Sequence, residues 1–476
     1  MIAFGLVVAL ASAGPTHADP SAAVSYAIDG PRPEGLWLST ELGAGYVGDD
    51  VVAGVAVGAG VETAPFGLHV EVPLTLRVID LAPAVSPALP SSCRYVRCEE
   101  WTDGGKASLD ALSRVVEELR VLRPGDVVHV RGGRLFATLG RGQHVARYTN
   151  ASEWDRRGSG LYVEGNVPFG RMKLEGLAGR LLAPQDLLAA RASSSVLEAE
   201  PGADDVTRFL GRMRLGIEGA ADLRAPLGLA VDGNGTVLPD SKSRPIVAGA
   251  VDVGWPLLDD IDGAGVQVEP WVSVSAMDGL QHQLAPDLVN RGFGVGGSAG
   301  LEVTVDAIFV AVRLSARGTL DGARHRSALF STLYDVDRKR VLAATGDYAA
   351  TGAAELSAPG GVGGGGALEV IVVRAVRAGA RVHVDPVPEA TELEAFAEVG
   401  VGPVLVGVRG LQRALRSPAD VVAFGARTFV VAEAAWSVWP PFSLFARWRH
   451  APRFSASGLG ADDDVFVGGS FDLVLQ

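Results

Sequence analysis

The segment Gly296 to Gly300 reads GGSAG and matches the G-x-S-x-G pattern that places a catalytic serine on a sharp turn. That turn requires a strand before the serine and a helix after it. The residues that follow, Leu301 to Val305, read LEVTV and predict a strand. We therefore expect no catalytic role for Ser298, and no other set of Ser, His and acidic residues stands out from the sequence.

Other motif-like patterns also lack the structural context that their chemistry needs. Gly292, Gly294 and Gly297 fit G-x-G-x-x-G, but the phosphate-binding form of this pattern opens a helix. Asp232 begins a stretch that resembles a calcium loop, yet Ser243 stands at the twelfth position in place of the bidentate Glu. The eight histidines contain no pair at helical metal spacing. The sequence predicts no metal and no cofactor.

The N-terminal residues predict export. Residues 1–18 hold an apolar run, Ile2 to Ala13, followed by the cleavage pattern Thr16-His17-Ala18. No Lys or Arg precedes the run, which a misassigned start codon would explain; a cytoplasmic helix is the alternative to a signal peptide. Residues 19–34 are expected to form a short periplasmic leader.

Cys93 and Cys98 are the two cysteines of the chain and form a C-x4-C pair. In an exported chain, such a pair in a loop is most simply a local disulfide. A zinc ion would need two more ligands nearby, and the segment supplies none. We expect a Cys93–Cys98 disulfide.

The composition favours a membrane protein without transmembrane helices. Hydrophobic residues make up 48% of the 476 residues and the mean hydropathy is +0.24. No apolar run reaches the roughly 18 residues that a transmembrane helix needs. A barrel with lipid outside and water inside uses apolar residues at alternate positions instead. The net charge of −13 argues against nucleic acid as a partner.

The stretch Val51 to Val78 shows the repeating unit of such a barrel. Two alternating runs flank the tight turn Ala64-Pro65-Phe66-Gly67. Apolar residues from Leu68 to Val78 share one face, and polar residues share the other. Each arm has about 11 to 13 residues, the length with which a tilted strand crosses a bilayer. We interpret the stretch as a transmembrane β-hairpin.

The same pattern recurs along the chain and predicts a single antiparallel up-and-down barrel over residues 35–476, with about 16 to 20 strands and 20 as the best count. The expected strands, besides the two arms of the hairpin, are Gly35–Val47, Ser113–Arg123, Val127–Phe136, Gly160–Val167, Arg171–Leu182, Leu187–Leu197, Thr207–Ala220, Pro245–Gly254, Gly265–Ala276, Phe293–Thr304, Ala307–Gly318, Ala367–Val376, Arg381–Val387, Leu393–Val401, Val404–Leu411, Val421–Val438, Phe442–Arg449 and Val465–Leu475. Ser113–Arg123 is the uncertain member, because its local propensity also favours a helix.

Turn chemistry supports this count. Short turns rich in Pro, Trp and Phe fall at every second connection, which is the periplasmic side of a bacterial barrel. They include Ala64 to Gly67, Val167 to Gly170 and Trp439 to Phe442. The longer connections then fall on the extracellular side.

Strand alternation assigns polar residues to the barrel interior, where they either line a passage or only satisfy the wall. The predicted pore-lining residues are His69, Glu71, Arg77, His129, Arg131, Lys173, Glu175, Arg208, Arg212, Arg214, Glu218, Gln267, Glu269, Arg313, Arg317, Arg381, His383, Asp385, Glu394, Glu398, Arg447 and Arg449. Two loops without alternation, Leu139 to Trp154 and Tyr334 to Arg340, are candidates to fold into the barrel, with exposed surface loops as the alternative. In the first of them, His144, Arg147 and Tyr148 are the expected constriction residues.

These features resemble the Gram-negative outer-membrane β-barrels of the porin and transporter type. The terminal strand, with Val465, Val467, Phe471, Leu473 and Leu475 on one face, belongs to that resemblance, although the class usually ends in Phe and this chain ends in Gln476. The resemblance implies the cell outer membrane as location, with membrane lipid, the barrel assembly machinery and small solutes as partners. It implies passive passage of small solutes and no enzyme activity. The alternatives are a non-conducting structural or surface-binding barrel and, third, an outer-membrane hydrolase. A Ser or Asp within hydrogen-bond distance of a His at the lumen mouth would favour the hydrolase.

Overall fold

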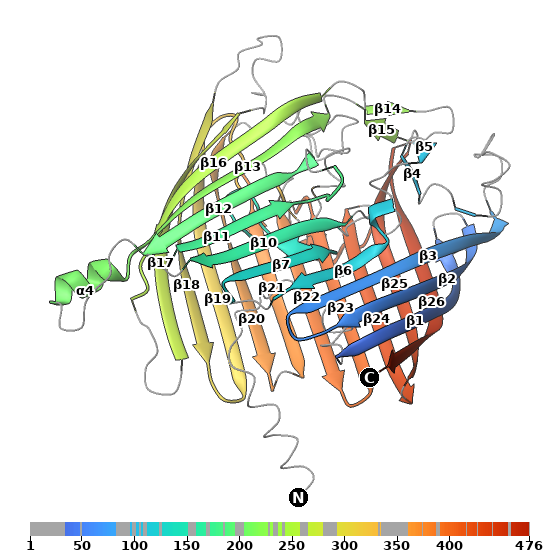
Figure 1. The fold of residues 1–476 in the computed structure, drawn as a ribbon. Coiled ribbons are helices and arrows are strands. Elements are labelled where there is room, and N and C mark those ends of the chain that lie inside the picture. Colours follow the sequence, from blue (N-terminus) through green and yellow to red (C-terminus); the bar gives the residue numbers. More distant parts are fainter. Residues whose placement is uncertain are drawn as a thin grey trace, which may run out of the picture.

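Twenty strands form one closed antiparallel sheet in the computed structural model (Figure 1). Each strand pairs with its neighbours in the chain, and β1 pairs with β26 to close the ring. Closure gives every strand two partners, so no backbone edge is left open to lipid. The structure describes residues 34–47, 50–81, 96–97, 101–103, 106–107, 112–122, 126–150, 159–167, 172–183, 186–195, 204–226, 229–231, 237–239, 243–257, 265–278, 293–331, 334, 360–373, 375–386, 391–415, 417–425, 427–439, 441–455 and 458–475.

The barrel strands alternate in direction along the chain and are mostly long enough to cross a bilayer at a tilt. They are β1 (Gly35–Val47), β2 (Asp50–Glu62), β3 (Phe66–Asp80), β6 (Val116–Val121), β7 (Val128–Gly133), β10 (Gly160–Val167), β11 (Met172–Ala178), β12 (Leu188–Ser195), β13 (Arg214–Pro226), β16 (Ser243–Gly254), β17 (Gly265–Asp278), β18 (Gly294–Asp306), β19 (Val310–Asp321), β20 (Gly361–Val372), β21 (Val376–Val384), β22 (Glu392–Val401), β23 (Val404–Arg413), β24 (Thr428–Trp439), β25 (Phe442–Ser455) and β26 (Gly458–Leu475). The predicted all-β barrel of 20 strands is confirmed.

The segment with mixed propensity, Ser113–Arg123, forms strand β6, which pairs with β3 and β7. Tertiary pairing overrides its helical propensity. The described residues also form three two-stranded sheets that are not part of the barrel wall. They pair β4 (Thr102–Asp103) with β5 (Lys106–Ala107), β8 (Phe136–Ala137) with β9 (Tyr148–Thr149), and β14 (Leu229–Val231) with β15 (Val237–Pro239). Phe136 therefore belongs to β8 and not to the predicted fifth strand.

Several predicted strand boundaries are wrong. Residues 205–211 form helix α4 (Asp205–Gly211), capped by the Asp204 side chain, and β13 starts only at Arg214. The predicted strand Val421–Val438 begins instead at Thr428, because η7 (Pro418–Val422) is a 3-10 turn that starts with a proline. β20 ends at Val372 and β21 starts at Val376, so the turn between them lies earlier than predicted.

Several short connections lie at one end of the barrel, and the three longest lie at the other. On the end where β1 begins, residues 63–65, 307–309, 373–375 and 402–403 are tight turns. On the other end, 81–115, 134–159 and 322–360 are long. Short turns mark the periplasmic end of outer-membrane barrels. The Pro65-Phe66, Pro403 and Pro441-Phe442 turns all lie at this periplasmic end, as the turn chemistry predicted.

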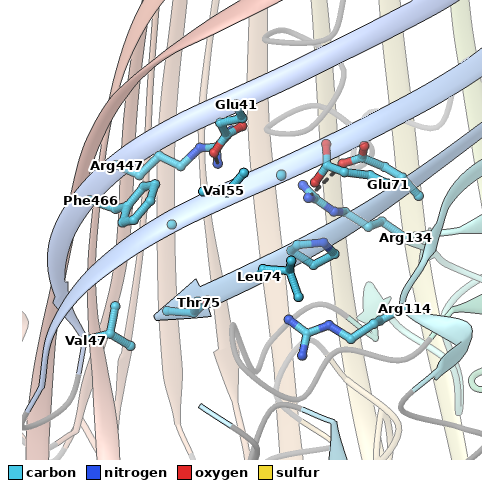
Figure 2. Close-up of a pocket in the computed structure, with 14 residues that line it drawn as sticks. Glu41, Val47, Val55, Glu71, Leu74, Thr75, Arg114, Arg134, Arg447 and Phe466 are labelled. Atoms are coloured by element: carbon cyan, nitrogen blue, oxygen red, sulfur yellow. Dashed lines mark hydrogen bonds and ion pairs between the residues drawn. The ribbon is translucent and has the colours of Figure 1, made fainter. Parts of the chain in front are cut away.

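Side chains pack closely inside the barrel where β1 and β26 close the ring. Arg447 on β25 reaches across β26 and donates from Nη1 to Oε1 of Glu41 on β1 at 2.9 Å. Phe466 of β26 points inward beside them, and Figure 2 shows the three side chains together on the inner face. A Cβ atom at Gly54 would fall on the Phe466 ring, so this strand position requires glycine. A small cavity of about 90 Å³ adjoins these residues.

Among the described residues, no helix is long and apolar enough to cross a bilayer. Residues 1–33, which carry the predicted signal peptide and most of the leader, lie outside the described part of the chain, as do Cys93 and Cys98. The signal peptide and the disulfide stay predictions.

Candidate functional site inside the barrel

The connection between β7 and β10 folds into the barrel. Its β8–β9 pair brings residues 138–147 inside, and His144, Val145 and Tyr148 are completely buried. Gly140 and Gly142 have positive φ angles of 50° and 65°, which favour glycine and let the chain reverse within a narrow space. We call residues 134–150 the inner loop.

A second connection, between β19 and β20, packs on the inner loop. Val145 and Phe330 form a parallel bridge. The Phe330 amide donates to the His144 carbonyl at 3.0 Å, and the Ala146 amide donates to the Phe330 carbonyl at 3.0 Å. The two loops therefore form one hydrogen-bonded unit inside the barrel.

An apolar cluster fixes this unit to one side of the wall. Leu139, Tyr148 and Phe330 of the loops are completely buried, and the wall contributes Ile246 and Met277. Further inward wall positions in the cluster are alanines, which leave room for the loops: Ala189, Ala220, Ala225 and Ala248. Burying large apolar side chains at about 1.5 to 3 kcal/mol each makes this a substantial attachment.

The barrel also contains a cavity of about 650 Å³ beside the inner loop. Its lining comes from the inner loop and from the strands between β10 and β22. The ionisable residues of this lining are Arg141, Arg147, Glu164, Lys173, Glu175, Arg191, Arg214, Asp252, Glu269, Glu302, Asp306, Arg313, Arg317, Glu369 and Arg381. Cations and anions are therefore nearly balanced in number around a polar space.

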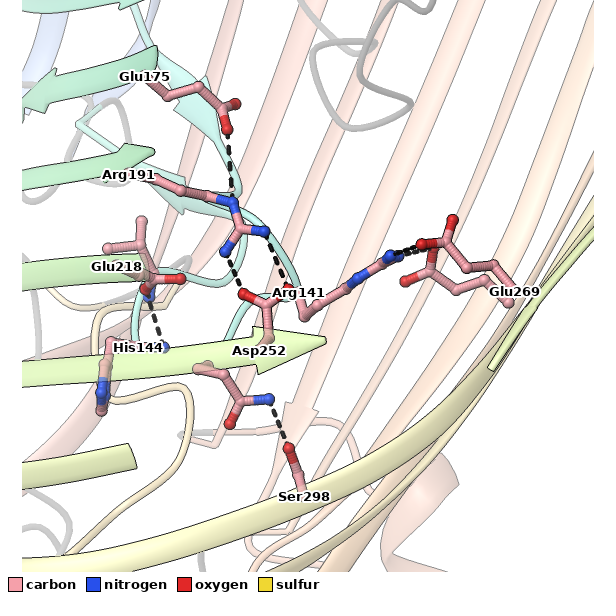
Figure 3. Close-up of polar contacts among 11 residues, drawn as sticks. Arg141, His144, Glu175, Arg191, Glu218, Asp252, Glu269 and Ser298 are labelled. Carbon is pink, nitrogen blue, oxygen red and sulfur yellow. Dashed lines mark hydrogen bonds and ion pairs between the residues drawn. The ribbon is translucent and has the colours of Figure 1, made fainter. Parts of the chain in front are cut away.

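Arg191 of β12 organises one wall of this cavity. It donates from Nη2 to Oδ1 of Asp252 at 3.0 Å and bonds the second carboxylate oxygen from Nη1, while its Nε lies 3.8 Å from Glu175 Oε2 (Figure 3). Two hydrogen bonds from one guanidinium to one carboxylate fix both groups in a plane. The guanidinium occupies the space where a Cβ atom of Gly140 would lie, so the inner loop sits directly on this pair.

Three polar contacts fasten the inner loop to the wall. Arg141 donates from Nη1 to Glu302 Oε2 at 2.6 Å and also bonds Glu269 (Figure 3). Arg147 Nη1 lies 2.7 Å from Glu394 Oε2. Gln143 donates to Ser298 Oγ at 2.5 Å. The loop is thus held by the adjacent strands β17 and β18 and, separately, by β22.

His144 lies at the centre of the loop contacts. Burial lowers the pKa of His144 from its ordinary value of 6.5 to about 4, with the neighbouring His325 acting in the same direction. The His144 and His325 rings are in edge contact at 5.9 Å. Glu218 of β13 accepts hydrogen bonds from the His144 and Val145 amides at 3.3 and 3.4 Å. The imidazole is therefore neutral at pH 7.

The predicted pore-lining residues fall into several groups. Lys173, Glu175, Arg214, Gln267, Glu269, Arg313, Arg317 and Arg381 line the large cavity. Glu71 and Arg447 line the small one. His69, Arg77, His129, Arg131, Glu218, His383, Glu394, Glu398 and Arg449 are buried or partly buried along the wall. His144, Arg147 and Tyr148 lie in the inner loop, inside the barrel.

Three of the predicted residues are not on barrel strands. Arg208 belongs to α4 and Arg212 is its C-cap, which donates to the Leu257 carbonyl at 3.2 Å. Figure 1 shows α4 projecting away from the wall. Asp385 follows the end of β21 and accepts a hydrogen bond from Arg326 Nε at 3.2 Å. Of the other proposed infolding segment, the structure describes only Tyr334, which is buried and donates to Asp222 Oδ2 at 2.8 Å.

Sequence reasoning missed several residues of the cavity. Asp252 sits at an inward position of β16, and strand alternation from Ala248 and Ala250 would have found it. Arg191 is the lone charge on its strand, and Arg141 stands in a loop without periodicity. No local pattern identifies those two.

A Ser–His–Asp arrangement lies near the extracellular end of the lumen. Ser275 Oγ of β17 is 2.8 Å from His325 Nε2, and His325 Nδ1 is 2.5 Å from Asp321 Oδ1. Ser327 also donates to Asp321 Oδ1, at 2.8 Å. Ser275 is only 2% exposed, and none of the four residues lines the large cavity. In this conformation the set fastens the loop after β19 to β17. Ser298, by contrast, lies within strand β18, as predicted.

The outer surface of the barrel is apolar. On β17, Val272 and Val274 are 48% and 64% exposed, and on β26 Phe471 is 47% exposed. Trp439 and Phe442 are in contact at the periplasmic end, with ring centroids 5.2 Å apart, as aromatic residues at a membrane interface are. A closed antiparallel barrel with this exterior spans an outer membrane. The fold is that of an outer-membrane β-barrel.

No protein-family model matches the chain, and no curated protein matches it in sequence. Solved structures of outer-membrane barrels align over most of its length at low similarity. The carbohydrate-binding barrel Wzi of Escherichia coli is 11% identical over 99% of this chain and 92% of its own, with a TM-score of 0.34. OprD of Pseudomonas aeruginosa is 10% identical over 93% and 94%, with a TM-score of 0.32. OccK2 of the same organism, solved with glucuronate, is 11% identical over 93% and 96%, with a TM-score of 0.34. At these TM-scores the matches carry no argument about function.

Proposed function

We propose that this barrel is a porin-like channel through which small solutes cross the outer membrane passively. The observation that carries the proposal is the cavity of about 650 Å³ inside the barrel, lined by charges from the wall and from the inner loop. Sites for small molecules have volumes of roughly 300 to 1,000 Å³, so the cavity suits a small solute. The inner loop narrows the lumen, and its ion pairs with the wall set the charge that a solute meets.

Reconstitution in planar bilayers tests this proposal. The expected result is stepwise single-channel conductance, with swelling of liposomes in isotonic solutions of small sugars or amino acids. The alternative, a non-conducting structural or surface-binding barrel, would give neither. A control preparation that is heat-denatured before reconstitution excludes conductance by contaminants, because it should lose every step.

The Ser275–His325–Asp321 arrangement favours a second candidate function, that of an outer-membrane hydrolase. The order of contacts, from hydroxyl to Nε2 and from Nδ1 to carboxylate, is the one that activates a serine nucleophile. Because Ser275 is buried, the loop after β19 would have to move before a substrate could reach it. A fluorophosphonate probe on the folded barrel decides: labelling lost in S275A would support the hydrolase, and absence of labelling in detergent and in liposomes would eliminate it.

A further inference from the structure

The arginines inside the barrel nearly all face a carboxylate. The pairs include Arg77–Asp50, Arg141–Glu302, Arg191–Asp252, Arg313–Glu369, Arg377–Glu398, Arg447–Glu41 and Arg449–Asp464. Such pairing is expected, because a guanidinium removed from water is costly unless an anion or several acceptors replace the water. An arginine of the lumen without an acidic partner therefore requires an explanation.

Arg317 and Arg381 are two such exceptions, and both line the large cavity. Among the residues that the structure describes, Arg317 of β19 donates only to neutral acceptors, the Gly142 carbonyl at 3.1 Å and His383 Nδ1 at 3.3 Å. Within the part of the chain that the structure describes, Arg381 of β21 has neither a hydrogen bond nor an ion pair. No carboxylate among the described residues therefore forms an ion pair with either guanidinium group.

The carboxylate opposite Arg381 already forms ion pairs with two other arginines. Glu394 stands across from Arg381 in the β21–β22 register. Its Oε2 lies 2.7 Å from Arg147 Nη1, and its Oε1 lies 3.2 Å from Arg409 Nε. Arg147 and Arg409 also both lie over the Phe136 ring, which holds them in place. Arg147 and Arg409 therefore occupy the two oxygens of Glu394, and Arg381 and Arg317 add further positive charge beside them.

Strand β20, which lies between Arg317 and Arg381, carries small residues towards the cavity. In the β19–β20 register Arg317 stands across from Gly365, and in the β20–β21 register Arg381 stands across from Ala367. The two arginines thus flank β20 two strand spacings apart, roughly 10 Å. A Cβ atom at Gly365 would fall against the Val382 carbonyl, so no larger residue fits there. Gly365 and Ala367 form a floor of small residues in the cavity, with a guanidinium on each side.

We propose that Arg317 and Arg381, across the small-residue floor of β20, form a binding site in the lumen for a small solute that carries a carboxylate or phosphate group. The planar guanidinium fork matches the two oxygens of such a group, and the charge-assisted hydrogen bonds replace the missing acidic partner. The inference rests on the proposed channel function and makes that channel selective for anions, even though the whole chain carries a net charge of −13.

Calorimetric titration of the folded barrel in detergent tests the site without requiring conduction. The probes are succinate, inorganic phosphate and uncharged succinamide. We expect at least one of the two anions to bind and succinamide not to bind. The anion that binds with the higher affinity shows whether the site prefers a carboxylate or a phosphate group. R381Q should weaken anion binding by about 10- to 100-fold, the value of one charge-assisted contact. R381K, which keeps the charge, should recover part of the loss.

R313Q is the matched control. It removes a charge from the same cavity and from the same strand as Arg317, but Glu369 keeps Arg377 as a partner. Its affinity for the anions should stay within about twofold of the wild type. The proposal is overturned if neither anion binds the wild-type barrel, or if R381Q binds them as tightly as R313Q does. Binding without bilayer conductance would instead refute the channel and leave the site intact.

Discussion

Arg141 offers a sharp test of the idea that the inner loop narrows the lumen. Glu269 and Glu302 stand directly opposite each other on β17 and β18, and Arg141 lies against both carboxylates. R141Q would leave two like charges facing each other across neighbouring strands, with Cβ atoms roughly 5 Å apart. At an effective dielectric constant of about 20, their repulsion amounts to about 3 kcal/mol. Because the Glu302 side chain is 42% exposed, solvent screening reduces this to about 2 kcal/mol.

In the wild type the docked Arg141 offsets this repulsion, whereas in R141Q docking offsets none of it. A loss of about 2 to 3 kcal/mol of docking free energy changes the ratio of undocked to docked inner loop by roughly 30- to 150-fold. The expected result is that R141Q channels spend measurable time in a state of higher conductance that wild-type channels rarely visit. R141Q/E302Q removes the repulsion between the two wall carboxylates but still lacks the Arg141 anchor of the loop, so it should show the same state of higher conductance as R141Q. R214Q is the control, since Arg214 also approaches Glu269, at 4.0 Å, but from the wall and not from the loop. Single-channel traces of R141Q that match those of R214Q would refute the reasoning.

Three further predictions concern the barrel and its inner loop. G54A places a Cβ atom on the Phe466 ring and should lower the free energy of unfolding by about 1 to 3 kcal/mol. The temperature at which the folded band disappears in SDS gels measures this loss. G176A is the control, because its added Cβ meets nothing within 4 Å and should leave that temperature unchanged. Burial holds the pKa of His144 at about 4 in the folded barrel, against 6.5 when the loop is released. The released state therefore takes up the proton first, so the stability of loop docking is fully present above about pH 6.5 and falls by up to about 3 kcal/mol towards pH 4. Glu218, Asp321 and His325 also face this contact, so open-state occupancy against pH should be compared with H144Q, which should show a weaker dependence. Finally, the unboiled protein should migrate differently from the boiled protein in SDS gels, and a helical circular dichroism spectrum would contradict the barrel.

The barrel wall could be predicted from the sequence because the alternation of apolar and polar residues along each strand shows which side chains face lipid. Alternation along Val51 to Val78 places apolar residues towards lipid, and Val72, Leu74 and Val78 are indeed exposed on the outer face. Ring closure then requires an even number of antiparallel strands, which favoured a strand at Ser113–Arg123 over the helix left open by its local propensity, and the structure shows the strand. Where alternation was weak, the boundaries failed, as at α4, whose residues precede Arg214 without a turn signal.

The lumen could not be predicted in the same way, because its contacts join residues far apart in the sequence. Arg141 meets Glu302 across 161 positions, and Ser275 meets His325 across 50. Inward positions such as Ala220 and Ala248 are apolar only because the inner loop covers them, and alternation alone does not distinguish them from outward positions. Composition of the inner loop suggested that it enters the barrel, but not which wall it would contact.

Planar-bilayer recording of the purified, refolded barrel tests the channel proposal most directly. The account predicts discrete conductance steps together with permeation of small solutes into liposomes, and a reversal potential in a KCl gradient that indicates anion preference and shifts towards cations in R381Q. A correctly folded barrel that gives no conductance steps and no solute flux would contradict the channel.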